Sequence, residues 1–116
     1  MFLEMVADLS EEMVFSCART LILEDGELSL QVSVEGISVK FPTTRRIAER
    51  IGVPHYYVLP YVAALESDGF LIRKERIGVF TTSDGTRWLF SGMYDGELSR
   101  LRYVCGDDLY RVLLSV

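Results

Sequence analysis

Few residues of this chain have the types and spacing that catalysis needs. His55 is the only histidine among the 116 residues, and no motif places a serine or cysteine nucleophile, or an orienting carboxylate, beside it. Asp107 and Asp108 could ligate a metal, but paired acids beside a glycine are more typical of a turn. Phosphate-loop, nucleophile-elbow and zinc signatures do not occur. We therefore expect no enzymatic activity, no cofactor and no metal.

Composition predicts one soluble, cytoplasmic domain. The 49% hydrophobic content can supply a single core. No stretch approaches the roughly 18 apolar residues of a membrane span, and Glu4 and Asp8 stand where a secretory signal would carry positive charge. Cys17 and Cys105 lack ligand spacing, so we expect buried reduced thiols, with a disulfide left open for a hyperthermophilic source.

The charge pattern favours binding of phosphate by clustered cations. The net charge is −5, but residues 1–41 hold two bases against eight acids, whereas residues 42–90 hold seven bases against five acids. Residues 91–116 hold three bases against four acids. Any nucleic-acid role therefore needs a local patch. The bases that could form it are Arg45, Arg46, Arg50, Arg73, Lys74 and Arg76.

The elements before this patch are predicted to be a helix and a β-hairpin. Ser10 can cap a helix whose apolar stripe ends before Asp25-Gly26. Residues 28–34 and 37–41 alternate apolar and polar side chains, which indicates a half-buried hairpin turned at Glu35-Gly36. The same apolar spacing links Phe2, Met5, Val6 and Leu9. We therefore expect either that the helix at Ser10 begins earlier or that a short helix precedes it.

Two helices and a second hairpin are predicted next. Thr43 or Thr44 can cap the first helix, and Gly52 supplies the turn that lets a second helix cross it. The second helix has an apolar stripe over residues 58–65 and ends at Gly69. Short apolar strands then flank the charged stretch 73–78, which indicates a hairpin with a basic tip.

The C-terminal part is less determined by its pattern. A short helix that includes Trp88 and Leu89 is expected after Gly85. Residues 98–104 and 109–116 fit either a hairpin turned at residues 106–108 or a final helix over residues 109–114.

Residues 43–85 resemble the winged helix-turn-helix regulators of the MarR and PadR type. The resemblance rests on Thr44–Val53, on Leu65–Ile72 and on Phe80–Gly85, and it runs without a gap. It implies an α+β fold: a single winged-helix domain over 1–116, with an extra N-terminal helix and β-hairpin at 1–41 and a C-terminal extension at 86–116. It also implies a dimeric, DNA-binding transcriptional regulator.

The resemblance further implies where double-stranded DNA would be contacted. The second helix would enter the major groove, while the start of the first helix and the basic hairpin, the "wing", would contact phosphates. Carried over to this sequence, the contact residues are Thr44, Arg45, Arg46, His55, Tyr56, Leu59, Arg73, Lys74 and Arg76.

The second helix departs from this pattern. Its exposed face has no Arg, Lys, Asn or Gln, the usual readers of base edges. Pro60 costs about 3 kcal/mol inside a helix unless the helix kinks or starts later. Two hypotheses therefore stand: a DNA-binding regulator with weak direct base readout, or a winged-helix module that binds protein through an apolar recognition face. Under both we expect a homodimer, through the apolar N-terminus and the tail 112–114.

Overall fold

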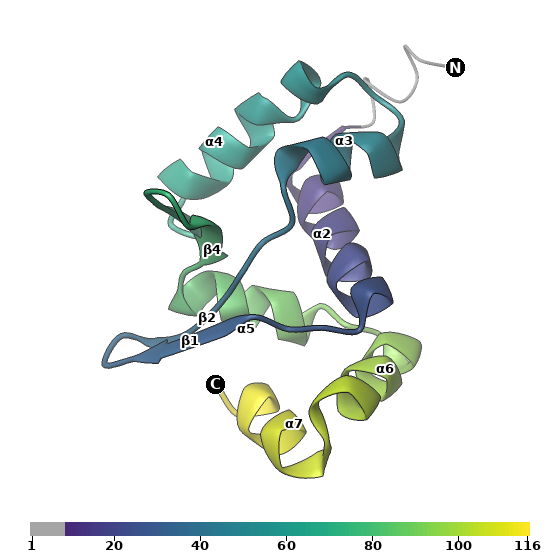
Figure 1. Ribbon diagram of the computed structural model, residues 1–116, viewed down its shortest axis with the longest axis vertical. Helices are drawn as coiled ribbons and strands as arrows, with labels where there is room; N and C mark the ends of the chain where they lie inside the picture. Colours follow the sequence, from purple (N-terminus) through teal and green to yellow (C-terminus); the bar gives the residue numbers. More distant parts are fainter. Residues whose placement is uncertain (1–8) are drawn as a thin grey trace.

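The structure is a computed structural model that describes residues 9–116. These residues form an α+β fold with six α-helices, one 3-10 helix and two antiparallel β-hairpins (Figure 1). The predicted apolar contribution of Phe2, Met5 and Val6 lies outside the described residues. The elements are α2 (Glu11–Asp25), β1 (Leu30–Ser33), β2 (Gly36–Val39), α3 (Thr44–Ile51), η1 (His55–Tyr57), α4 (Leu59–Ser67), β3 (Leu71–Lys74), β4 (Gly78–Thr81), α5 (Ser83–Ser91), α6 (Asp95–Cys105) and α7 (Asp107–Leu114).

Helix α2 begins and ends where its sequence predicts. The Ser10 side chain accepts a hydrogen bond from the Met13 amide at 3.1 Å, which satisfies one of the amides left open at a helix start. Gly26 ends the helix in the left-handed conformation, with φ 67°, which glycine adopts without steric cost. The apolar side of α2 packs against α3, α4, α5 and α6, so this helix is the element around which the others assemble.

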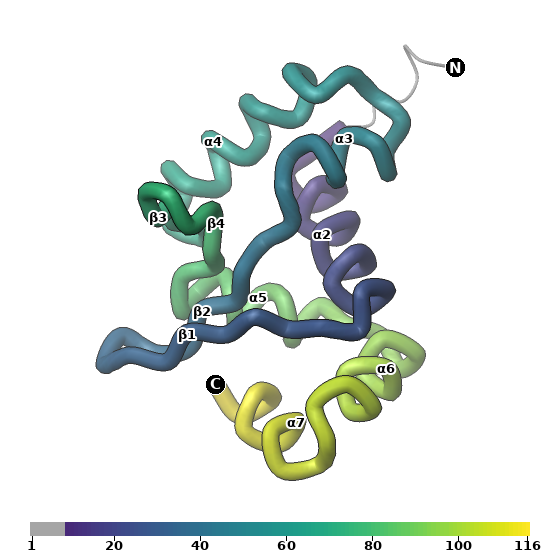
Figure 2. Tube along the Cα trace, viewed as in Figure 1, coloured from purple at the N-terminus to yellow at the C-terminus, as the bar shows by residue number. Residues whose placement is uncertain are grey.

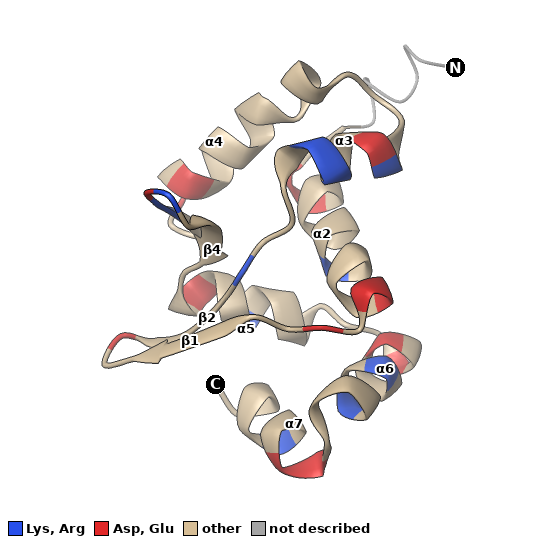
Figure 3. Cartoon of the chain, viewed as in Figure 1, with Lys and Arg blue, Asp and Glu red and all other residues tan. Residues whose placement is uncertain are grey.

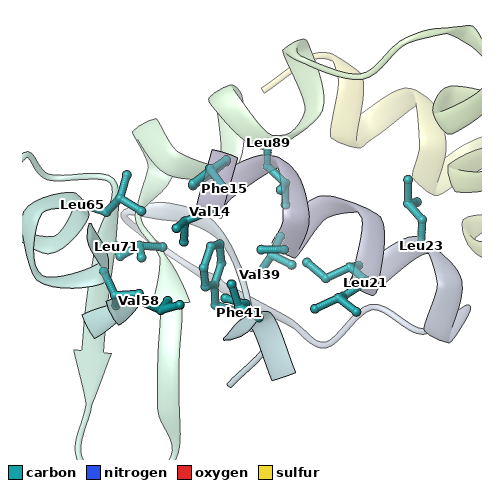
Figure 4. Close-up of a cluster of buried hydrophobic side chains, with 14 of the residues drawn as sticks. Val14, Phe15, Leu21, Leu23, Val39, Phe41, Val58, Leu65, Leu71 and Leu89 are labelled. Carbon is teal, nitrogen blue, oxygen red and sulfur yellow. The ribbon is translucent and has the colours of Figure 1, made fainter. Parts of the chain in front are cut away.

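The core lies between α2 and the surrounding elements. Val14 and Phe15 of α2 are fully buried, and the Phe15 ring stacks on Trp88 of α5 with 4.1 Å between ring centroids. Figure 4 shows side chains from α2, α4, α5 and both hairpins meeting in this cluster. The predicted apolar stripes of the first two-thirds of the chain therefore converge on one core.

A buried arginine joins α2 to the end of α5. Arg19 is only 7% exposed; its Nε donates to the Leu89 carbonyl at 2.8 Å, and its Nη2 to the Trp88 carbonyl at 3.2 Å. The Trp88 carbonyl also accepts the Gly92 amide at 3.1 Å, whereas the Leu89 carbonyl in the last turn of α5 has no other donor among the described residues. The guanidinium thus satisfies the Leu89 carbonyl, which would otherwise be buried without a partner.

Replacing Arg19 with methionine is expected to destabilise the protein by about 2 kcal/mol, because the buried Leu89 carbonyl loses its donor while the packed volume is nearly kept. Urea unfolding monitored by circular dichroism measures this change. The matched control is Arg87→Met on the exposed side of α5, which should change the unfolding free energy by less than about 0.5 kcal/mol. Equal effects of the two substitutions would contradict the capping role of Arg19.

The two hairpins are joined at the base of β2. β1 and β2 pair antiparallel with Leu30 opposite Val39, and beyond β2 the Phe41 amide donates to the Val79 carbonyl of β4 at 2.8 Å. The prediction of a half-buried β1–β2 hairpin is wrong for its outer part: Val32 is 77% exposed and Val34 fully exposed. The reason is that the hairpin extends past the start of α5 (Figure 2): the Ser83 hydroxyl of α5 donates to the Glu35 carbonyl in the turn, but the Val32 and Val34 side chains lie uncovered.

The two helices after the first hairpin follow the expected turn chemistry. The Thr43 side chain caps α3 by accepting from the Arg46 amide at 3.2 Å, and Gly52 ends it with φ 87°. A single 3-10 turn, η1, then separates α3 from α4. Because α4 begins only at Leu59, Pro60 lies in its first turn, where a missing amide costs no helical hydrogen bond. The second helix starts late enough to tolerate Pro60.

The C-terminal third is helical throughout. α5 begins at Ser83, capped by the Thr82 side chain, and so starts before Gly85 and not after it as the sequence suggested. Of the two alternatives for the last residues, the hairpin is wrong, and the final helix corresponds to α7. Leu101 of α6 and Leu113 of α7 are fully buried, which explains why these helices pack against the core.

Candidate nucleic-acid interface

The predicted contact residues lie on consecutive elements that touch one another. α3 packs against η1, and α4 against β3, so the start of α3, the exposed side of η1 and α4, and the β3–β4 hairpin are linked through direct contacts. Figure 3 shows Lys and Arg at the start of α3, in the connection between β2 and α3, and in the β3–β4 hairpin. Their individual environments differ in ways that the sequence does not reveal.

His55 is engaged within the protein. Its Nε2 lies 2.5 Å from the Thr44 hydroxyl, so η1 is tied to the first turn of α3. Both residues are half-buried. The structure therefore brings together two of the predicted contact residues, but their hydrogen bond to each other connects α3 to η1.

Three of the predicted phosphate-binding arginines in this region form ion pairs. Arg46 donates two hydrogen bonds to the Asp25 carboxylate, each 2.8 Å long, which holds the pKa of Asp25 below its ordinary value. Arg50 pairs with Glu24, and Arg73 with Glu66 at 3.0 Å. The acidic end of α2 thus neutralises much of the positive charge of α3.

Three cations remain exposed and without a side-chain partner in the described part of the chain: Lys40, Arg45 and Arg76. Lys40 pairs through its backbone with Phe80 of β4 and lines a hollow together with Thr43 and Arg46, so it lies between the β3–β4 hairpin and the start of α3. The other nine bases each have an ion pair, a hydrogen bond or a ring contact; they are Arg19, Arg46, Arg50, Arg73, Lys74, Arg87, Arg100, Arg102 and Arg111.

Lys40 was missed at the sequence level because it falls in the acidic first segment. The signal that could have found it is its place at the end of the second strand of the first hairpin, directly before the helix that carries Arg45. Lys74, by contrast, was predicted, and it folds back over the Phe80 ring at 4.7 Å and contacts the Gln31 side chain. Its charge therefore lies between the two hairpins and not at the tip.

The exposed side of η1 and α4 is apolar and aromatic. Tyr56 is 63% exposed and Leu59 42%, and the Tyr56 ring meets Tyr57 edge-on with 4.6 Å between centroids. Pro60 and Ala63 are also exposed. This face offers shape and van der Waals contact but no bidentate hydrogen-bond donor.

Neither cysteine forms part of a reactive or metal-binding cluster among residues 9–116. Cys17 and Cys105 are unpaired and half-buried, and burial raises the pKa of both thiols, which makes the thiolate less available. Within the same part of the chain, no group of His, Cys, Asp and Glu side chains is arranged to hold a metal ion.

Comparison with known proteins adds no assignment: no family model, no curated protein and no solved structure matches the chain. Among the described helices, none has the length and the apolar character required to span a membrane.

Proposed function

We propose that this protein is a DNA-binding regulator of the winged-helix type that holds duplex DNA mainly through its phosphates. In this proposal α2, α3 and α4 are the three helices of the fold, and the β3–β4 hairpin is the wing. The segment that follows β2 acts as the short third strand, because it pairs with β4. The order of α2, the segment after β2, α3, α4 and the β3–β4 hairpin supports this assignment, in which the β1–β2 hairpin is an addition.

The observation that carries the proposal is the distribution of unpartnered positive charge. Lys40, Arg45 and Arg76 are the exposed bases without a side-chain partner in the described chain, and all three lie on the wing or beside the start of α3. An exposed cation that has no internal partner can release condensed counterions from DNA at no cost of breaking an ion pair. A protein with a net charge of −5 thus keeps its available positive charge in one region.

Sequence discrimination would be modest. The α4 face presents Tyr56 and Leu59, which can contact a thymine methyl or a sugar but cannot read guanine in a bidentate manner. We infer that any preference among duplexes comes from groove shape and deformability.

Titration of a fluorescein-labelled random duplex with the full chain at about 50 mM salt tests this proposal. Fluorescence anisotropy should rise saturably and should reverse when salt is added. Absence of binding at low salt would contradict the proposal.

Asp25→Asn should tighten DNA binding by several-fold, because it releases Arg46 from its carboxylate partner and adds a cation beside the start of α3. The anisotropy titration measures this at constant salt. The matched control is Asp108→Asn, which removes the same charge from the Arg111 pair on α7. Equal tightening by both variants would show an effect of net charge only and would contradict a local role for Arg46.

The apolar face of η1 and α4 supports a second candidate, a protein-binding module. Tyr56 of η1 and Leu59 at the start of α4 are both exposed, and the two elements follow each other directly. Aromatic side chains of this kind often anchor protein interfaces. The double variant Tyr56→Asp, Leu59→Asp should then abolish capture of a protein partner while leaving salt-dependent DNA binding within a few-fold. Capture that survives the double substitution would exclude this candidate.

A further inference from the structure

The outer edge of β1 is open. Val39, the partner of Leu30, directs its amide to the Thr81 hydroxyl at 2.8 Å, and the neighbouring Lys40 amide donates to the Ser29 carbonyl at 2.8 Å. Ser29 therefore occupies a hydrogen-bonded position toward the β2 side, and Leu30 does not. Because backbone groups alternate along a strand, the amides and carbonyls of Leu30 and Val32 point away from β2. Among the described residues, no other segment forms a backbone hydrogen bond with them.

This edge is short, but it lacks the charged side chains and proline that often keep an exposed strand unpaired. Residues 28–34 contain no charged residue and no proline, whereas free edges are usually protected by lysine, proline or a bulge. The side chain of Val32 is 77% exposed, and that of Val34, the first turn residue after β1, is fully exposed. Both the backbone and the apolar face of β1 thus offer a surface that a further strand would complete.

We propose that β1 pairs antiparallel with β1 of a second copy, so that two hairpins form one four-stranded sheet across a two-fold axis. A two-fold contact requires a surface that is complementary to itself. An edge that is uncharged and apolar on one face meets that requirement without placing like charges together.

The side chains of β1 select the register. With Val32 on the two-fold axis, the exposed Val32 side chains of the two copies face each other. Shifting the axis to Gln31 would set the two Gln31 side chains, each in contact with a Lys74 ammonium, directly opposite each other and bring these like charges together. The Val32 register therefore covers the exposed valine of β1 and avoids this repulsion.

This pairing also orients the β3–β4 hairpins. The Gln31 side chain alternates to the face opposite Val32 and contacts the Lys74 ammonium. In the dimer, Lys74 of each copy would lie on the same face of the joined sheet. The dimer interface is independent of whether the protein binds DNA, since it rests on β1 alone.

Light scattering on the full chain tests the interface. The wild type should be a dimer at micromolar concentration, and Val32→Lys should be a monomer, because two ammonium groups would meet at the axis. The control Val112→Lys, at a half-exposed position of α7, should remain a dimer. A monomeric wild type would overturn the proposal, as would a dimer that dissociates with Val112→Lys but not with Val32→Lys, which would place the interface on the C-terminal tail.

Cross-linking tests the register without a destabilising charge. In a hydrogen-bonded antiparallel pair the opposed Cα atoms are about 5.5 Å apart, a separation that a disulfide accommodates. In a chain with Cys17→Ser and Cys105→Ser, Val32→Cys should form a disulfide-linked dimer on mild oxidation. Gln31→Cys should form much less, because position 31 faces position 33 of the partner subunit. Efficient cross-linking at position 31 and none at position 32 would contradict the register.

Discussion

Replacing Gly85 with alanine is expected to destabilise the protein by about 3 kcal/mol. A Cβ at this position would lie 2.0 Å from the Phe70 carbonyl oxygen and 3.1 Å from the Thr81 Cβ. The Phe70 carbonyl is held in place because it accepts the Thr82 amide at 3.0 Å. Relief of the overlap would therefore require α5 to move away from the strand that it packs against, at the expense of the Thr82 hydrogen bond.

Chemical denaturation of the Gly85→Ala variant measures this loss. Gly96→Ala in α6 is the matched control, because its added Cβ would meet only the exposed Tyr94 ring, at 2.9 Å, and that side chain can rotate away. Alanine also favours a helix over glycine by about 1 kcal/mol, so the control should be neutral or more stable. An unfolding midpoint of Gly85→Ala equal to that of the wild type would contradict the packing of α5 on Phe70.

The second large effect concerns DNA. Changing Lys40, Arg45 and Arg76 together to alanine should weaken binding to a random duplex by roughly 500-fold at 0.1 M salt, since each lost phosphate contact forfeits about eightfold through counterion release at that concentration. The folded structure should persist, because all three side chains are exposed and without a side-chain partner among the described residues. Anisotropy titration gives the affinity, and circular dichroism gives the fold.

The control variant carries alanine at Arg87, Arg102 and Arg111, which removes the same net charge from arginines that pair with nearby carboxylates. Its affinity should stay within about tenfold of the wild type, because it removes no proposed phosphate contact and acts only through the long-range field. Equal losses in the two triple variants would mean that net charge, and not the wing and the α3 start, governs binding.

Local sequence signals predicted the elements well where one residue type satisfies a specific backbone need. Ser10, Thr43 and Gly52 all occupy the cap positions that their chemistry favours, because capping depends on hydrogen bonds within a few residues. Pro60 was informative for the same reason: a helix tolerates proline in its first turn, and α4 begins accordingly.

Features set by distant contacts were not predictable from the sequence. The alternation of residues 28–34 indicates a strand, but only the arrangement of the helices decides that Val32 and Val34 have no cover. The last residues are helical because Leu101 and Leu113 both find the core, which their short pattern leaves undecided. Tertiary packing decided both features.

In the candidate site, too, some features follow from the local sequence and others depend on distant contacts. The position of Arg45 and the basic tip of the β3–β4 hairpin follow from the sequence, whereas the neutralisation of Arg46 by Asp25 joins residues 21 positions apart. His55 and Thr44, each predicted to contact DNA, are bonded to each other. Whether a cation can contact a DNA phosphate depends on whether a nearby carboxylate already pairs with it. The proposed phosphate contacts are therefore assigned to Lys40, Arg45 and Arg76.

The salt dependence of duplex binding tests the central proposal most directly. Three phosphate contacts predict that the logarithm of the association constant falls with the logarithm of the salt concentration with a slope of about −2.7 or steeper. The triple variant at Lys40, Arg45 and Arg76 should have a slope shallower by about that amount, and the triple variant at Arg87, Arg102 and Arg111 should keep the slope of the wild type. A wild-type slope near zero, or the same slope in all three proteins, would contradict phosphate binding by the wing and the start of α3.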